Sequence, residues 1–411
     1  MTSLRLTAAL LWLAAGFLHC SSAGSAPATT TPAAPATGAT GLLTGKLAAG
    51  SPSDQLWSIP TLYKNEDNPL LQELAVIGQL QTQYGYGSDD SGQFGSNDLS
   101  EESLWGDIEV RRFRIGLKAR LFGKLSFLNL TDLYPDLSPR IYKRTPETYF
   151  TWAENEALNI SAGKVELKFN REQEYSSREF PVFERSALGN MFYGGELTGA
   201  WVCGKGIKGG WLYFLGAYSN DREDEWSDFE GGAMILGKIG YNYTPMTDFD
   251  LAEVKFQLLH NTDPGYSDSN TPTASPLYSN CISISNELTK GPYGLTTEFM
   301  WGDGTEGASD VCGLYAMPFW FITKKLQLIS VIEVAGGSED NAVLLPKRYE
   351  YYSPGDNTGD RYFATFAGLN YYVNGHKLKL MSGVKYSYLD GTPTGDGFDG
   401  WTFIAGVRMA F

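Results

Sequence analysis

The sequence predicts an all-β fold, a transmembrane antiparallel β-barrel of about sixteen strands. Only 19% of the 411 residues are charged, 14% are aromatic and 47 are glycine, which favours strands and turns over helices. Beyond the N-terminus, no stretch holds the roughly 18 apolar residues that a membrane helix needs. The chain instead repeats alternating segments of about ten residues between turn residues, which is typical of barrel strands.

The N-terminus predicts export. Arg5 precedes the apolar run 8–18, and small residues follow at 21–23, so residues 1–23 are expected to be a signal peptide. Cys20 suggests a lipoprotein signal instead, but His19 stands where such signals favour a small residue. Residues 24–51 are rich in Ala, Thr and Pro, so residues 24–72 are expected to be a flexible tether with a periplasmic N-terminal segment.

Residues 73–411 are expected to form the barrel. The predicted strands begin near Glu73, Gly106, Lys124, Thr148, Leu158, Met191, Trp211, Gly232, Asp250, Asn280, Tyr293, Asp310, Lys325, Tyr362, Lys377 and Trp401. Their even number is that of single-chain bacterial outer-membrane barrels. Three cysteines lie in this region, and either a Cys281–Cys312 disulfide or unpaired apolar cysteines agree with the pattern.

The last segment shows which residues share a face. Trp401, Phe403, Ala405, Val407, Met409 and Phe411 are all apolar, whereas the alternate positions include Thr402, Gly406 and Arg408. An apolar row that continues to a terminal aromatic residue resembles the assembly signal of outer-membrane barrels. The alternative is an ordinary buried terminal strand of a water-soluble domain.

The stretch "VRRFRIGLKARLF" (110–122) alternates in the same way. Phe113, Ile115, Leu117, Ala119 and Leu121 form one face, and Arg112, Arg114, Lys118 and Arg120 form the other. Cations near the middle of a bilayer cost about 2–4 kcal/mol each, so the basic face is expected to point into the lumen. Arg111 breaks the alternation, and we expect it to reach the membrane interface from the beginning of the strand.

Closure of the last strand onto the first would collect these cations on one side of the lumen. The expected inward residues are Arg112, Arg114, Lys118, Arg120, Lys377, Lys379, Lys385 and Arg408, with Gln79, Gln81 and Gln83 between them. Guanidinium and amide groups bind oxyanions, so this side is expected to contact small anionic solutes. The alternative is that these cations only order water in the channel.

Several segments together resemble the phosphate-selective porin O and P family. They are "IEVRRFRIGLKARLFGKLSFLNLTDL", "ISAGKVELKFNREQEYSSREFPVFERSALG", "GWLYFLGAYSND" and "LNYYVNGHKLKLMSGVKYSYLDG" before "FIAGVRMAF". The resemblance implies an outer-membrane porin, a homotrimer, with a long loop folded inward to narrow the pore. It places candidate anion contacts of this constriction loop at Lys164, Lys168, Arg171, Arg178 and Arg185. Glutamates are interleaved with them, so salt bridges that only hold the loop explain the pattern equally well.

Other classes of function have less support. The chain has 47 acidic and 32 basic residues, which argues against nucleic-acid binding. No catalytic motif accompanies its histidines, and nothing in the sequence indicates a cofactor or a metal ion. The acidic runs at 88–103 and 219–232 are expected to be solvated loops, or alternatively sites for divalent cations. The sequence therefore predicts a passive, anion-preferring porin among the lipids of a Gram-negative outer membrane, with a plugged structural or surface-interaction barrel as the alternative.

Overall fold

The computed structural model describes residues 40–45, 51–89, 104–135, 140–220, 225–227, 229, 232–264, 278–305, 309–339, 342–345, 358–391 and 398–411. The predicted signal peptide and most of the predicted tether lie outside the described residues, as do most of the acidic run 88–103 and part of the run 219–232. The described part of the chain contains no helix that is long and apolar enough to cross a membrane.

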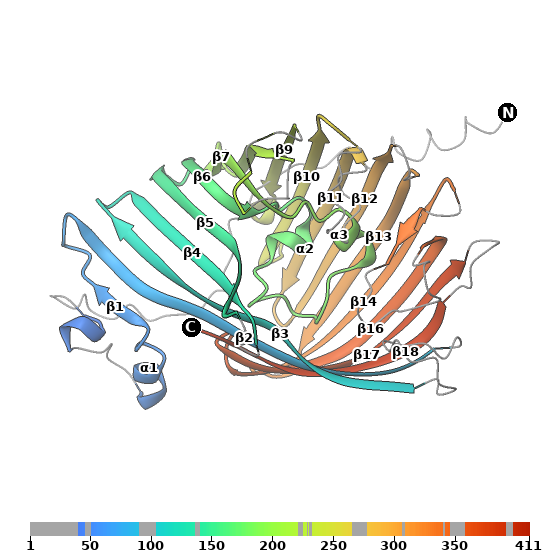
Figure 1. The fold of residues 1–411 in the computed structure, drawn as a ribbon, viewed down its shortest axis with the longest axis horizontal. Coiled ribbons are helices and arrows are strands. Elements are labelled where there is room, and N and C mark those ends of the chain that lie inside the picture. The colour runs from blue at the N-terminus through green and yellow to red at the C-terminus, as the bar shows by residue number, and fades with distance from the viewer. Residues whose placement is uncertain are drawn as a thin grey trace.

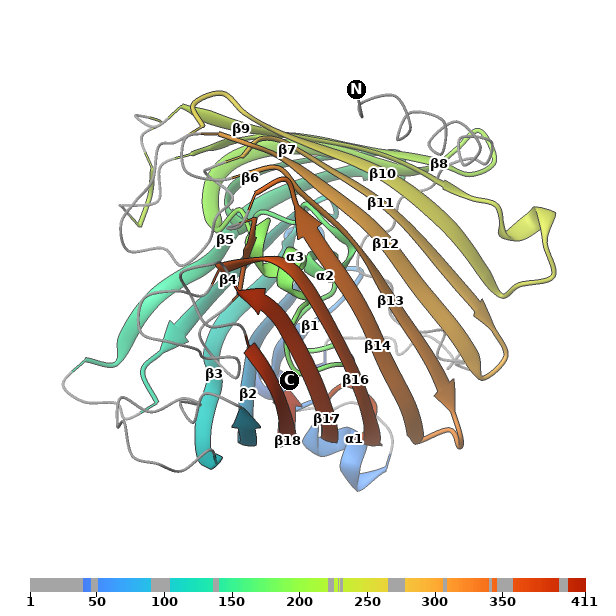
Figure 2. The ribbon, with the colours of Figure 1, turned by 90° about the vertical axis from the view of Figure 1, so that its right-hand side faces the viewer.

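Within these residues, sixteen strands form a closed antiparallel barrel (Figures 1 and 2). They are β2 (Leu71–Asp89), β3 (Leu104–Leu121), β4 (Leu125–Leu133), β5 (Tyr142–Asn155), β6 (Leu158–Glu166), β7 (Glu196–Ile207), β8 (Trp211–Ser219), β9 (Ala233–Asn242), β10 (Leu251–Asn261), β11 (Tyr278–Lys290), β12 (Tyr293–Gly304), β13 (Val311–Phe321), β14 (Leu326–Gly337), β16 (Thr358–Asn374), β17 (Leu378–Gly391) and β18 (Phe398–Ala410). Two shorter strands, β1 (Thr61–Lys64) and β15 (Val343–Leu344), pair with β2 and β16. The predicted fold class and strand number are confirmed.

Most predicted strand starts lie close to the observed ones. The largest difference is at β5, which begins at Tyr142 and not at Thr148. Pro146 lies inside β5, and the β4–β5 register shifts between Leu130 and Asp132, so the alternation is interrupted where the strand was expected to start.

The barrel closes where β18 meets β2. Phe411 and Gly78 exchange two backbone hydrogen bonds of 3.0 Å. A Cβ at residue 78 would lie 2.4 Å from the Phe411 ring, so the ring needs a glycine beneath it. Beyond Phe411, β1 pairs with the remaining edge of β2, from Thr61 opposite Ala75 to Lys64 opposite Glu73. The N-terminal segment, with η1 (Leu42–Thr44) and α1 (Pro52–Leu56), thus completes the sheet edge that β18 leaves open.

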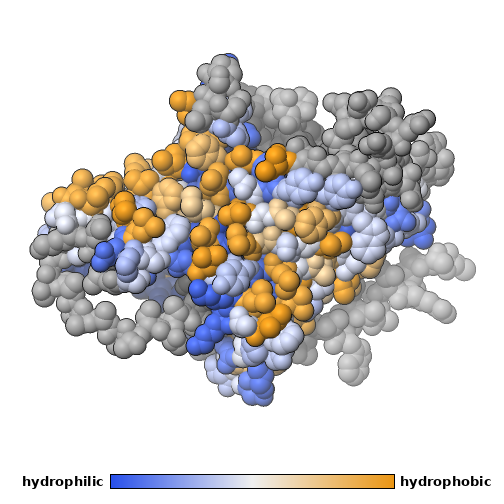
Figure 3. Space-filling model, turned by 90° about the horizontal axis from the view of Figure 1, so that it is seen from below, coloured by the Kyte–Doolittle hydropathy of each residue, from blue (hydrophilic) through white to orange (hydrophobic). Residues whose placement is uncertain are grey.

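The outer face of the barrel is apolar. Its exposed residues include Ile115 and Leu117 of β3, Leu215 of β8, and Trp401 and Phe403 of β18. Apolar side chains spread across the face seen in Figure 3. Large exposed apolar side chains on every side of a closed barrel require a surrounding bilayer, so the strands span a membrane.

The connection between β6 and β7, residues 167–195, folds into the lumen (Figures 1 and 2), and we call it the inward loop. It contains α2 (Arg171–Glu174) and α3 (Ala187–Met191). Its side chains Leu167, Phe169, Phe180, Phe183 and Phe192 are buried in one apolar cluster with residues of the barrel wall. A large part of the lumen is therefore packed like a protein core.

The three cysteines of the barrel are unpaired. Cys281 is buried whereas Cys312 is exposed. The disulfide alternative is therefore not present.

Candidate functional site

One end of the inward loop is held by a network of charges on β9–β12. Glu174 of α2 pairs with Lys238 at 2.8 Å and with Lys255 at 2.5 Å. Arg171 pairs with Glu287 at 2.7 Å and lies over the Tyr175 ring at 3.9 Å. All of these charged side chains are at least partly buried, and buried pairs of this kind fix geometry because removing one partner leaves an uncompensated charge.

Two wall carboxylates bind the first backbone amides of the loop helices. Glu298 of β12 accepts from Arg171 N at 2.8 Å, and Glu333 of β14 accepts from Ala187 N at 2.9 Å. Each helix thus begins on a carboxylate, the charge that helix N-termini favour.

Glu172 of α2 links the two loop helices through hydrogen bonds with Ser186, the residue before α3. Its carboxyl group accepts from Ser186 N at 3.1 Å and contacts the Ser186 hydroxyl. Burial and the neighbouring Glu298 and Glu333 together raise the pKa of Glu172 to about 8, although the hydrogen bonds from Ser186 lower it. Glu172 is therefore protonated at neutral pH.

The middle of the inward loop is bound on the opposite side of the lumen. Arg408 of β18 donates to Phe180 O at 2.8 Å and to Phe183 O at 2.7 Å, and Lys379 of β17 donates to Phe180 O at 2.8 Å. Gln81 donates to Ser177 O at 2.8 Å. The loop therefore crosses the lumen between two anchored regions.

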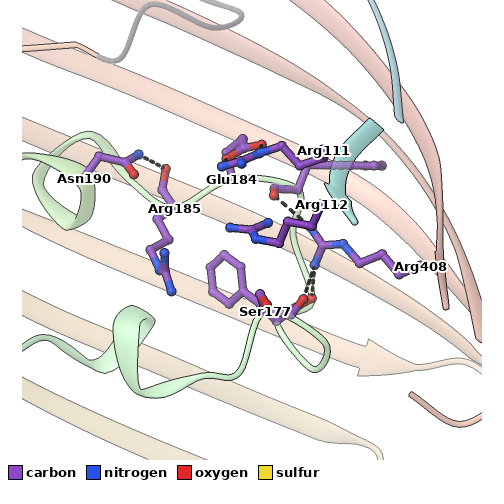
Figure 4. A pocket seen from close by; sticks show the side chains of 9 residues that line it. Arg111, Arg112, Ser177, Glu184, Arg185, Asn190 and Arg408 are labelled. Carbon is purple, nitrogen blue, oxygen red and sulfur yellow. Dashed lines mark hydrogen bonds and ion pairs between the residues drawn. The ribbon is translucent and has the colours of Figure 1, made fainter. Parts of the chain in front are cut away.

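A recess remains between the inward loop and strands β3 and β18, and we call it the arginine recess (Figure 4). Its lining residues are Arg111, Arg112, Ser177, Phe180, Phe183, Glu184, Arg185, Asn190 and Arg408. Four arginines thus face one acid. Glu184 is already bound in a fork by Arg111, at 2.7 and 3.0 Å.

Arg112 keeps donors available to the recess, whereas the one unpartnered donor of Arg408 is buried. Arg112 has one hydrogen bond among the described residues, from Nη1 to Gln81 Oε1 at 2.9 Å. Arg408 is 3% exposed, and its buried Nε has no partner in the described part of the chain. Free guanidinium N–H groups of this kind bind carboxylate and phosphate oxygens.

Arg111 corrects the sequence analysis. It does not reach the membrane interface but pairs with Glu184 inside the lumen. The β2–β3 register shifts between Gln81 and Thr82, which face Arg112 and Val110, so Arg111 is the extra residue of a β-bulge. The bulge shifts the alternation by one position and adds Arg111 to the arginines of the inner face.

The other cations that the sequence placed on the lumen wall are distributed differently. Arg114 is buried in a fork with Asp132, which also accepts from Arg144 at 3.0 Å. Lys118 pairs with Glu73 at 3.0 Å and Arg120 with Glu66 at 2.5 Å, both close to the N-terminal segment. Lys377 is exposed in the turn before β17, and Lys385 lies 3.7 Å from Glu333. From this set, Arg112 and Arg408 line the arginine recess, and Lys379 shares the Phe180 carbonyl with Arg408.

The cations predicted for the constriction loop also lie in different places and do not form one cluster. Lys164 belongs to β6, on the face of the exposed Ile160 and Ala162, and pairs with Glu225 at 3.1 Å. Lys168 and Arg171 have acid partners, and neighbouring Glu147 raises the pKa of Lys168. Arg185 lines the recess and pairs with Glu166 at 2.8 Å. Arg178 forms no ion pair in the part of the chain that the structure describes.

Comparison with known proteins identifies the fold. No protein-family model matches the chain, and no curated protein matches it. Solved structures do match over 82% of the chain. They include an anion-selective porin from Comamonas acidovorans (12% identity, 99% of that chain, TM-score 0.55). Two others are the outer-membrane channel DcaP of Acinetobacter baumannii (11%, 97%, 0.54) and a Salmonella typhi OmpF complex with daunomycin (12%, 98%, 0.54).

At such identities the likeness concerns the fold alone. The chain has the architecture of Gram-negative outer-membrane barrels, in agreement with its apolar outer face. Its resemblance to the phosphate-selective O and P family stays a prediction.

Proposed function

We propose that this barrel is a porin for passive diffusion of small hydrophilic solutes, with a preference for anions. The observation that carries the proposal is the arginine recess, where four arginines face a single acid that Arg111 already neutralises. Selectivity depends on the charges at the narrowest part of a pore, so the formal net charge of −15 does not oppose it.

Arg112 and Arg185 are the proposed anion contacts. Both line the recess and are partly exposed, whereas Lys379 and Arg408 donate to carbonyls of the inward loop. Guanidinium forks match oxyanions such as phosphate, and this supports the family resemblance without establishing phosphate as the solute.

Planar-bilayer recording of the purified full chain tests the proposal. We expect unitary current steps and a reversal potential of the sign for anions in a salt gradient. Arg112→Gln with Arg185→Gln is expected to move the reversal potential toward zero. Lys377→Gln, a turn substitution, is the matched control and is expected to change it little. Cation selectivity of the unmodified chain would contradict the proposed preference.

A second candidate function is a plugged structural or surface-interaction barrel. It is favoured by the inward loop, which is anchored on both sides of the lumen and packed in an apolar cluster. Absence of ion-sized steps under the same conditions would select this candidate.

We further propose a homotrimer within the lipid of the outer membrane. Strands β4 and β6 are short, and Asn129 of β4 donates to Thr148 Oγ1 of β5 at 2.7 Å on the outer face. Polar side chains on the lipid side of a barrel favour contact with protein over lipid. Light scattering of the solubilised chain is expected to give the mass of three copies. The substitution Asn129→Arg is expected to lower this mass, because it disrupts the contact between copies.

A further inference from the structure

The carboxylate of Glu184 occupies a place where donors of the barrel wall converge. Its Oε1 accepts from Arg111 Nε at 2.7 Å and from Gln83 Nε2 at 3.1 Å, and its Oε2 accepts from Arg111 Nη2 at 3.0 Å. The donors belong to β2 and β3, whereas the carboxylate belongs to the inward loop. A guanidinium fork with an amide beside it also suits the carboxylate of a free solute.

The chain is anchored on both sides of Glu184. On one side, Arg408 donates to Phe183 O at 2.7 Å, and on the other side Arg185 pairs with Glu166 at 2.8 Å. The inward loop therefore presents the Glu184 carboxylate to Arg111 at a high effective concentration, as a short linker does for a tethered ligand.

The Glu184 side chain is nevertheless open to exchange. The side chains of Arg111 and Glu184 are 21% and 22% exposed, and both line the arginine recess. Arg112 lies beside the pair (Figure 4). A partly exposed ion pair contributes little net free energy, so a solute anion can replace one partner. Rotation of the Glu184 side chain, without movement of the loop backbone, makes the Arg111 fork available next to Arg112.

We infer that Glu184 is a tethered competitor of the solute anion at the arginine recess, and that Arg111 is an anion contact which Glu184 covers between binding events. The inference rests on the proposed function, because it names what regulates affinity at the same site. A site for passage must bind its solute weakly enough to release it, and the return of Glu184 to Arg111 promotes that release. The solute class is a small anion with a carboxylate or a similar oxyanion group, since Glu184 shows that a carboxylate fits these donors.

Saturation-transfer NMR with propionate on the detergent-solubilised full chain measures this competition without requiring conduction. Propionate ends in the same group as a glutamate side chain. We expect Glu184→Gln to raise the propionate affinity by about tenfold, because the competing carboxylate makes charge-assisted hydrogen bonds that propionate must otherwise replace. Glu109→Gln is the matched control, since Glu109 also accepts from Gln83, at 3.0 Å, but does not line the recess. We expect it to raise the affinity less than about twofold.

Two further variants separate competition from a general effect of charge. Glu184→Asp keeps the charge but shortens the side chain by one methylene on an anchored segment, so its carboxylate does not reach the fork. We expect it to give most of the gain of Glu184→Gln. In a chain that carries Arg111→Gln, the same Glu184→Gln substitution is expected to add little, because no fork remains to compete for. Heat-modifiability on gels checks that each variant is folded.

The outcomes distinguish this inference from the proposed function. Unchanged propionate affinity in Glu184→Gln, an equal gain in Glu109→Gln, or an undiminished gain in the Arg111→Gln chain would overturn the tethered competitor. Anion-selective current steps in a bilayer without a gain in affinity would refute the inference alone. A gain in affinity in a chain that gives no current steps would support the inference and refute the porin.

Discussion

Arg408→Leu is expected to release the middle of the inward loop. Arg408 donates to Phe180 O at 2.8 Å and to Phe183 O at 2.7 Å. Hydrogen bonds from a charged donor contribute about 1.5–3 kcal/mol each, so the two together hold the loop by about 3–6 kcal/mol. Leucine removes both donors, so Phe183 O loses its guanidinium donor and Phe180 O keeps only the one from Lys379.

The lower limit of this free energy already predicts a large effect on loop opening. Since 1.4 kcal/mol corresponds to a factor of ten, about 3 kcal/mol raises the population of detached loop roughly a hundredfold. Amide hydrogen exchange in residues 176–183 measures this population, because exchange there requires local opening. We expect it to accelerate by about two orders of magnitude, while exchange in β11 and β12 stays unchanged.

Arg361→Leu is the matched control, because Arg361 also belongs to a barrel strand but its side chain is 72% exposed. We expect no acceleration in the loop for this variant. If Arg408→Leu and Arg361→Leu exchange alike in residues 176–183, then Arg408 does not hold the loop, and the anchoring argument is wrong.

Three further outcomes are expected. Gly78→Ala places a Cβ 2.4 Å from the Phe411 ring and is expected to lower the heat-modifiability midpoint on gels, whereas Gly237→Ala, with open space around its Cβ, is not. Glu174→Gln removes the carboxylate that Lys238 and Lys255 share, although Lys255 keeps Glu253 at 3.1 Å, and is expected to lower the free energy of unfolding by about 3–5 kcal/mol in urea titration. The exposed Asp248→Asn is the control and is expected to change it little. Burial beside Glu298 and Glu333 raises the pKa of Glu172 from 4.5 to about 8, so the stability that neutral Glu172 contributes is fully present below pH 4.5 and is lost as pH rises through about 8, where a buried negative charge forms. Loop exchange, corrected for the intrinsic pH dependence, is therefore expected to accelerate from pH 5 to 9 in the unmodified chain but not in Glu172→Gln.

The strands could be predicted because the constraint on them is local. A residue that faces lipid must be apolar wherever the chain goes afterwards, so alternation in β3, β17 and β18 identifies the inner and outer faces. Closure between β18 and β2 follows from the even strand number and is confirmed by their pairing.

Arg111 shows where local alternation is insufficient. Ile108 and Val110 are exposed on the outer face, and so are Ile115 and Leu117, although the two pairs differ in parity. One extra residue between them is the only way that both can face lipid, so the sequence did contain the signal for a bulge. The signal lies in the apolar positions on either side of Arg111 and not in Arg111 itself.

The path of the inward loop could not be predicted in this way. Alternation places Lys379 and Arg408 on the inner face, but it does not show that backbone carbonyls cover them. A carbonyl acceptor has no signature in the sequence, since every residue carries one. Contacts between a loop and a strand more than 200 residues away therefore appear only in the folded chain.

The inner cations divide into those that anchor the inward loop and those proposed to contact solutes. The division follows from how many N–H donors of each cation are not already bonded to the protein. Lys379 has no exposed surface, and Arg408 is 3% exposed with Nη1 and Nη2 on loop carbonyls, so both act mainly as anchors. Arg112 donates one hydrogen bond to Gln81 and remains partly exposed beside Lys379 and Arg408. The same inner face thus holds the loop with its buried cations and leaves a smaller set for solutes. A substitution that removes charge without moving the loop must therefore be made at Arg112 and not at Arg408.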